Sequence, residues 1–137
     1  MIAFLGASAL IYLIEGGEPF ARRIRRQLQA LATGKPGLRI AISRLSQLEC
    51  RVGPLKSGDT QTLADYDFFF ARPDILWVEL TPTVVGLATV IRARYSMKTP
   101  DALQAACCLQ LGEGHVFVTG DNAFKKVAGL NTHILRG

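Results

Sequence analysis

Short apolar runs alternate with longer amphipathic stretches along the chain. Runs of about four to six apolar residues bounded by Gly, Pro or polar residues are typical of buried strands, and apolar residues at every third or fourth position are typical of helices. We predict strands at residues 2–5, 39–42, 75–80, 115–118 and 132–135. We predict helices at residues 7–14, 19–32, 44–52, 60–71, 82–95, 100–112 and 121–127, and a turn at residues 34–37.

The alternation of strands and helices indicates an α/β fold. Its expected form is a three-layer α/β/α sandwich with a mainly parallel central sheet. The 137 residues are enough for one core, so we expect a single domain over residues 1–137. Ligands of such sheets bind beyond the carboxyl ends of the strands. This rule directs attention to Gly6, after the first strand, and to Thr119 and Asp121, after a later one.

Several helix ends carry recognisable signals. Ser43 is expected to cap the helix that follows it, and residues 53–54, Gly-Pro, are expected to disturb that helix. Thr99 suits the cap position of a later helix and Pro100 its first turn. Asp101 then falls in the first turn, where the helix dipole favours a negative charge.

Net charge and cysteine content indicate the kind of partner and the cellular compartment to expect. A net charge of +5 favours polyanions such as RNA, or an acidic protein, as partners. Three cysteines without metal-ligand spacing indicate neither a disulfide framework nor a zinc site, so we expect a reducing cytoplasm. Residues 1–14 imitate a signal peptide, but no Lys or Arg precedes the apolar run, and it is shorter than the roughly 20 residues of a membrane helix. We therefore expect no membrane association.

Three of the 11 acidic residues stand at strand ends or near helix starts: Glu49, Asp101 and Asp121. Each also has a structural interpretation. Asp101 can stabilise a first helical turn, Asp121 can cap the helix after it, and Glu49 can lie on the surface. Taken singly, these positions do not separate a structural role from a functional one.

Four segments together resemble one family. They are FLGASALIYL at the start, SRLSQLEC with Glu49, KTPDALQAA with Asp101, and VTGDNAF with Asp121. The chain resembles the PIN-domain ribonucleases over essentially its whole length, and most closely the VapC-like toxins of type II toxin–antitoxin pairs. KTPDALQAA is the most specific of the four segments.

The resemblance implies a metal-dependent endoribonuclease. In that family four carboxylates hold one or two Mg²⁺ or Mn²⁺ ions, hard cations that prefer oxygen ligands. By this resemblance Glu49, Asp101 and Asp121 are catalytic residues that bind the metal directly or hold metal-bound waters, and Ser8 and Thr119 are supporting hydroxyls. The metal would lower the pKa of a bound water and neutralise charge that develops on the phosphate.

Gly6 departs from the family pattern. It occupies the position of the family's first Asp, two residues before Ser8, and supplies no oxygen to a metal. Glu15 and Glu18 lie two or more helical turns further along and cannot replace that Asp. We expect an intact fold with impaired metal binding and RNA cleavage. The alternative is a catalytically silent PIN module that binds RNA or an antitoxin; a phosphoacceptor receiver domain fits less well, because it needs paired acids after the first strand.

The resemblance also implies partners, namely an RNA substrate, a cognate VapB-like antitoxin and a second copy in a homodimer. A basic cluster on the second predicted helix could contact RNA phosphates or form the solvated side of an amphipathic helix, and both interpretations stay open. Its residues are Arg22, Arg23, Arg25 and Arg26.

Overall fold

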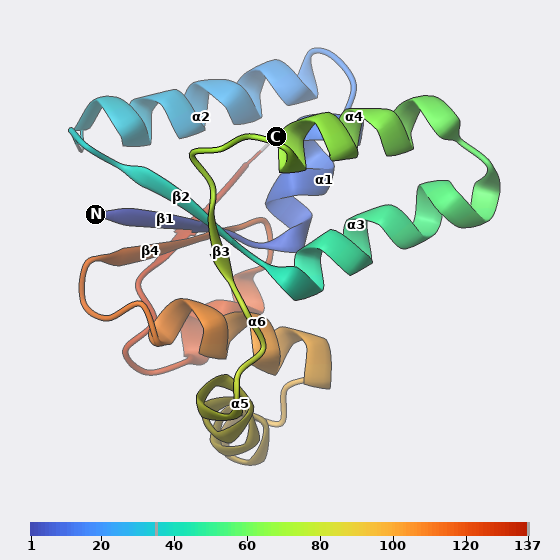
Figure 1. Ribbon diagram of the computed structural model, residues 1–137. Coiled ribbons are helices and arrows are strands. Elements are labelled where there is room, and N and C mark those ends of the chain that lie inside the picture. The colour runs from blue at the N-terminus through green and yellow to red at the C-terminus, as the bar shows by residue number, and fades with distance from the viewer. Residues whose placement is uncertain (35, 137) are drawn as a thin grey trace.

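Five strands form one parallel sheet in the computed structural model, which describes residues 1–34 and 36–136 (Figure 1). The order across the sheet is β3-β2-β1-β4-β5. The strands are β1 (Ile2–Leu5), β2 (Arg39–Ser43), β3 (Leu76–Val78), β4 (His115–Thr119) and β5 (Thr132–Ile134). The helices are α1 (Ala7–Glu15), α2 (Phe20–Gly34), α3 (Arg44–Ser57), α4 (Thr60–Phe70), α5 (Pro82–Tyr95), α6 (Thr99–Leu109) and the 3₁₀ helix η1 (Asn122–Lys126).

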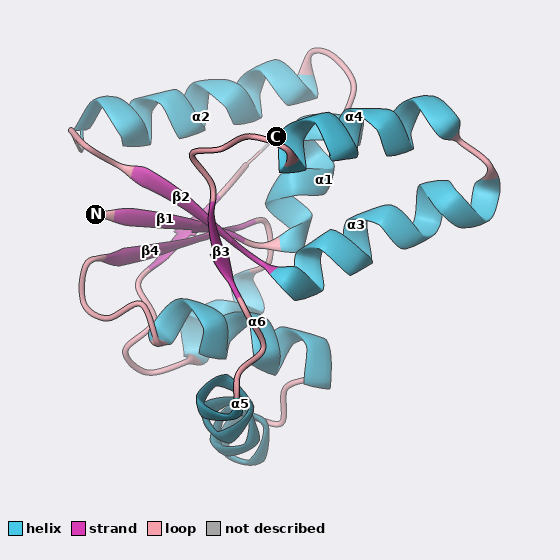
Figure 2. Ribbon diagram, in the orientation of Figure 1, coloured by secondary structure: helices cyan, strands magenta, loops and turns pink. Residues whose placement is uncertain are grey.

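Two helical layers enclose the sheet, so the predicted α/β/α sandwich is confirmed (Figure 2). The side chains of β1 alternate between two cores, as they must in a strand buried on both faces. Phe4 packs in the core under α5 and α6, whereas Ala3 and Leu5 pack in the core under α1, α2 and α4. Both cores consist of buried apolar side chains, with partly buried ones packed around them.

The apolar opening segment is the centre of the fold. Residues Ile2–Leu5 form the middle strand, and α1 then packs against α2 and α3. Within residues 1–34 and 36–136, no helix has the length and apolar character needed to span a bilayer.

Helix α3 corrects the sequence prediction. Ser43 caps it as expected, since the Ser43 side chain accepts a bond from the backbone N–H of Ser46 at 3.2 Å. The helix does not end at Gly53 and Pro54, however, but continues to Ser57. Pro54 is buried, and α3 packs along α4, so tertiary contacts outweigh the cost of a proline inside the helix. Gly58, in the left-handed conformation at φ 76°, ends the helix instead.

Smaller differences concern other element ends. Thr99 is the first residue of α6 rather than its cap, because the Lys98 carbonyl accepts the first helical bond from Ala102 at 2.9 Å. Asp101 lies in the first turn, as expected. The segment after Asp121 is a 3₁₀ helix and β3 is shorter than predicted. The turn expected at residues 34–37 includes residue 35, which lies outside the described residues.

The course of α3 generates a stability prediction. Outside its chain neighbours and its own helix, a Cβ atom at Gly53 would meet nothing within 4 Å. Gly53 directly precedes Pro54, however, and the proline ring disfavours a helical residue with a Cβ atom at that position, which offsets the gain in helix propensity. Gly53→Ala should therefore change the stability of the protein by less than about 1 kcal/mol. Gly58→Ala, at a positive φ, should destabilise it. Urea unfolding of both variants measures this. A loss of stability in Gly53→Ala as large as that in Gly58→Ala would contradict this assignment of the helix end.

Candidate functional site

A small pocket of about 90 Å³ opens at the carboxyl edge of the sheet. It draws on segments far apart in the sequence: the end of β1, α1, α3, α6, the end of β4 and η1. Its lining residues are Gly6, Ala7, Ser8, Glu49, Asp101, Gln104, Phe117, Thr119, Asp121 and Phe124. The structure thus brings together every residue that the sequence nominated for metal binding or support, together with Gly6.

Strand pairing places two of these segments side by side. Leu5 of β1 is in register with Val118 of β4, so the residues after each strand meet at the same level. The backbone N–H of Gly6 donates to the Val118 carbonyl at 2.9 Å, which continues the ladder to the pocket. Phe117 and Phe124 contribute an apolar wall, with their ring centroids 4.5 Å apart.

Two hydroxyls tie the β1–α1 junction to the end of β4. The oxygens of Ser8 and Thr119 are 3.2 Å apart, and the backbone N–H of Gly120 donates to Ser8 Oγ at 3.0 Å. The backbone N–H of Asp121 donates to Thr119 Oγ1 at 3.1 Å. Ser8 and Thr119 therefore hold the backbone at Gly120 and Asp121.

Asp121 combines two of the roles considered for it. Its Oδ1 accepts a bond from the backbone N–H of Ala123 at 2.8 Å, so it caps η1. The same side chain lines the pocket. Capping uses only part of the acceptor capacity of a carboxylate, which has about four lone-pair positions.

Glu49 and Asp101 enter the pocket from opposite helical layers. Glu49 is half-buried on α3, and its Oε1 accepts a hydrogen bond from Gln104 Nε2 of α6 at 3.0 Å. Gln104 also donates to Ser46 Oγ at 2.9 Å. Sequence reasoning missed Gln104. The available signal was a lone amide side chain within residues 102–109, which are otherwise apolar.

Asp101 is electrostatically unfavourable in its ionised form. Burial raises the pKa of its carboxyl above the ordinary value of 3.8, and the negative charge of Asp121 raises it further. Lys98 and Lys126 act in the opposite direction. A cation in the pocket would favour the ionised form and relieve the repulsion between the two carboxylates.

The donor set has the right chemistry for a hard cation but is incomplete for direct coordination. Carboxylate and carboxamide oxygens suit Mg²⁺ or Mn²⁺. Across residues 1–34 and 36–136, however, no three His, Cys, Asp or Glu side chains lie close enough together to hold one ion. Mg²⁺ usually keeps several waters and binds one or two carboxylates, so these residues fit a hydrated ion held partly through water.

Gly6 leaves room for a side chain. A Cβ atom there would lie 3.4 Å from the Val118 carbonyl oxygen and 3.5 Å from the Phe117 ring, which are ordinary contacts. The backbone is extended, with φ −67° and ψ 164°, so any residue can adopt it. The missing carboxylate is therefore a property of the residue at position 6 and not of a distorted pocket.

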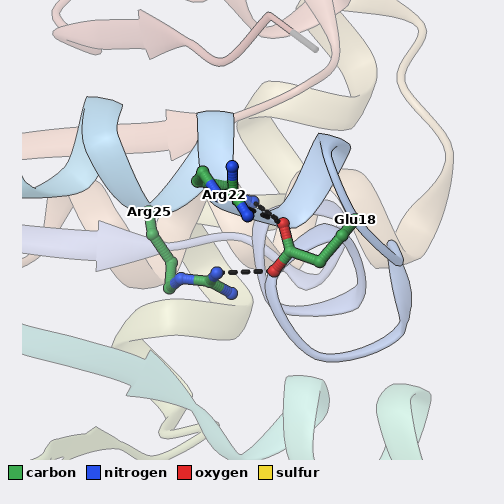
Figure 3. A network of polar contacts seen from close by, with 3 residues as sticks. All are labelled: Glu18, Arg22 and Arg25. Atoms are coloured by element: carbon green, nitrogen blue, oxygen red, sulfur yellow. Dashed lines mark hydrogen bonds and ion pairs between the residues drawn. The ribbon is translucent and has the colours of Figure 1, made fainter.

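The basic cluster lies on α2, away from the lining of the pocket. All four of its arginines are exposed. Glu18 pairs with two of them, since its carboxylate lies 2.6 Å from Arg25 Nη2 and 3.8 Å from Arg22 Nε (Figure 3). The cluster is thus a surface feature, and part of its charge is balanced locally.

Comparison with known proteins assigns the family. The model of the PIN domain matches residues 3–130, and the chain belongs to this family. No curated protein matches its sequence. Its fold is similar to that of a chain in the structure of VapBC2 from Rickettsia felis, which was solved bound to a DNA fragment from the VapBC2 promoter. The TM-score is 0.80 and the sequence identity is 21%, over 99% of this chain and 100% of the other.

Two further solved structures share the fold. A chain of VapBC-1 from nontypeable Haemophilus influenzae has a TM-score of 0.73 and 17% identity over 98% of each chain. A chain of a toxin–antitoxin complex from Klebsiella pneumoniae has a TM-score of 0.69 and 22% identity, covering 93% of this chain and 94% of that one. The predicted PIN-like fold is confirmed along nearly the full length.

The raised pKa of Asp101 predicts a pH dependence. A carboxyl whose pKa is higher in the folded state than in the unfolded state opposes folding once it ionises, so its cost is absent below pH 3.8 and grows as pH rises through the folded-state pKa. The stability of Asp101→Asn relative to the parent should therefore increase from pH 3 to pH 7. Urea unfolding across this range measures the difference.

Asp74→Asn is the matched control. In the parent, hydrogen bonds from Arg72 lower the pKa of the Asp74 carboxyl, so the ionised form of Asp74 favours folding. The stability of Asp74→Asn relative to the parent should fall over the same pH range. A parallel response of the two variants would contradict the assignment for Asp101.

Proposed function

We propose that the chain is a VapC-like toxin, a metal-dependent endoribonuclease that a cognate antitoxin neutralises, and that Gly6 impairs its activity. The observation that carries the proposal is the pocket. Glu49, Asp101 and Asp121 come from three distant segments and line a single pocket of about 90 Å³ in a PIN domain. Asp121 also caps η1, but its role as a cap does not require carboxylates from two other segments beside it.

The chemistry assigned to the pocket follows from its residues. Glu49, Asp101 and Asp121 would hold Mg²⁺ or Mn²⁺, which supplies an activated water and neutralises charge on the scissile phosphate. Ser8 and Thr119 hold the backbone that carries Asp121. The wall formed by Phe117 and Phe124 excludes water from one side, which strengthens electrostatic interactions within the pocket.

Gly6 explains why activity should be impaired. A site built for four carboxylates retains three, and it loses one negative charge together with one ligand. Metal affinity falls because fewer anionic oxygens face the cation. The fold is unaffected, since the backbone at Gly6 still pairs with Val118.

The absence of a carboxylate at Gly6 also favours a second candidate function, a PIN module that binds RNA or an antitoxin without cleaving RNA. Gly6 and the lack of a close three-carboxylate group in the described part of the chain are what this alternative expects. It predicts RNA binding that does not respond to divalent metal. Activity in a protein with the Asp restored distinguishes the two candidates.

An antitoxin partner is supported by exposed apolar side chains. Leu48, Val52 and Leu55 follow one face of α3 with 62%, 53% and 65% of their surface exposed, and Phe68 of α4 is 84% exposed. Apolar groups at this density on one helix hairpin favour burial against another chain. The solved relatives include toxin–antitoxin complexes. A homodimer and a cytoplasmic location belong to the same proposal.

Restoring the carboxylate tests the function. Gly6→Asp should bind Mn²⁺ at least about tenfold more tightly than the parent, equivalent to about 1.4 kcal/mol, and should acquire metal-dependent RNA cleavage. Isothermal titration and a cleavage assay on a mixed RNA pool measure both. Gly6→Asn, of similar size but without charge, is the matched control and should gain little. A Gly6→Asp protein that folds but neither binds Mn²⁺ nor cuts RNA would exclude the nuclease proposal.

RNA binding by α2 is tested separately. Glu18 partly neutralises Arg22 and Arg25, so the double change Arg23→Ala and Arg26→Ala should weaken RNA binding more than Arg22→Ala with Arg25→Ala. The slope of affinity against salt concentration should also fall by about one for each RNA phosphate that an arginine no longer neutralises. Fluorescence anisotropy with a labelled RNA measures both quantities. Unchanged affinity in both double variants would assign the arginines to the solvated helix face.

A further inference from the structure

Gln104 is the exception among the buried polar side chains of the core. It is 3% exposed, and its Oε1 is the single buried side-chain oxygen or nitrogen without a hydrogen-bond partner among the residues that the structure describes. Buried polar groups are normally paired, and an orphaned one in a native protein calls for an explanation. Gln104 also lines the pocket that contains Glu49 and Asp101.

The orientation of the amide follows from its neighbours. Nε2 donates to Glu49 Oε1 at 3.0 Å and to Ser46 Oγ at 2.9 Å. A carboxylate only accepts hydrogen bonds, so the nitrogen and not the oxygen must face Glu49. Both amide hydrogens are then used on α3, and the oxygen remains unpaired. Gln104 therefore makes its contact with Glu49 while its own Oε1 is left without a hydrogen-bond donor.

The sequence spacing of the partners fits a role in the pocket. Ser46 and Glu49 are one turn apart on α3, and Asp101 and Gln104 are one turn apart on α6, so each pair shares a helix face. Gln104 is the side chain that bridges the two faces. It therefore joins the helix that carries one proposed ligand to the helix that carries another.

We propose that Gln104 is a positioning residue that holds the carboxylate of Glu49 in the geometry required for divalent-metal binding. This inference rests on the proposed function. A glutamate has three rotatable side-chain bonds, and a half-buried one held by a donor at one oxygen loses less freedom when it meets a cation. The other oxygen of Glu49 is left for the ion or for one of its waters. Groups that orient metal ligands typically change metal affinity by about 10- to 100-fold when removed.

A purely structural Gln104 makes a different prediction. If the residue only joined α3 to α6, an unbranched apolar side chain of similar length would remove the orphaned oxygen and leave metal affinity unchanged. If it positions Glu49, the same change would weaken metal binding while the fold persists. Gln104→Met separates the two, and Gln104→Leu serves as a second variant if the first does not fold.

The experiment measures Mn²⁺ binding by isothermal titration and stability by urea unfolding, in the parent chain and in the Gly6→Asp protein. In the Gly6→Asp protein, Gln104→Met should weaken Mn²⁺ binding at least about tenfold. Cys108→Ala is the matched control, because Cys108 is buried one turn further along α6 and does not line the pocket. It should reduce stability without changing the affinity.

A double-mutant cycle tests whether the effect passes through Glu49. The cycle is made in the Gly6→Asp protein. Once Glu49→Ala is present, adding Gln104→Met should cause no further loss of Mn²⁺ affinity. If Gln104→Met acted by disordering α6 as a whole, the affinity would fall further even without Glu49. Equal Mn²⁺ affinity with and without Gln104→Met in the Gly6→Asp protein would overturn this inference and leave the proposed function standing. A Gly6→Asp protein without any Mn²⁺ affinity would overturn both.

Discussion

The parallel pairing of β1 with β2 on one side and β4 on the other is the constraint on which the structure depends. Phe4 is in register with Ala41 and with Phe117, and it faces the opposite core from Ala3 and Leu5. A shift by one residue would exchange the two sets of side chains between the cores. Because the register is held by burial on both faces, the residues that follow each strand emerge at one edge and at one level.

The pocket is a consequence of this edge. Gly6 follows β1, Thr119 is the last residue of the neighbouring β4, and α3 and α6 begin on opposite sides of the sheet. Beyond the last strand residues no sheet separates the two helical layers, so a side chain of α6 can contact one of α3. The bond between Gln104 and Glu49 is such a contact. The site therefore lies outside the carboxyl ends of the strands, where ligands of open α/β sheets bind.

Two features of the pocket lower the stability of the folded chain when no ion is bound. Asp101 is held where burial and Asp121 both raise the pKa of its carboxyl, and the oxygen of Gln104 is buried without a partner. Perturbed pKa values and orphaned polar groups of this kind cluster at functional sites. At position 6 the chain carries no further charge. It thereby avoids additional repulsion and also gives up an anionic ligand.

Local sequence pattern determined much of the fold. The sequence predicts the strand at residues 2–5 and the helix at residues 82–95 with the bounds that the structure shows. Both predictions rest on local signals, since the spacing of apolar residues and the capping of a helix end depend only on residues close together in the sequence. Pattern alone could not separate cap from ligand at Asp121, and the structure shows a cap that also lines the pocket. The resemblance of four short segments to the PIN family was needed to group the acids.

Tertiary structure decided the rest. Helix α3 continues through Pro54 because packing against α4 outweighs a local preference to stop. Gln104 has no local signal for its contacts, since its partners Ser46 and Glu49 lie 58 and 55 residues away. Helix and strand propensities reflect interactions between near neighbours in the sequence, whereas the pocket consists of contacts between segments that only the closed sheet brings together.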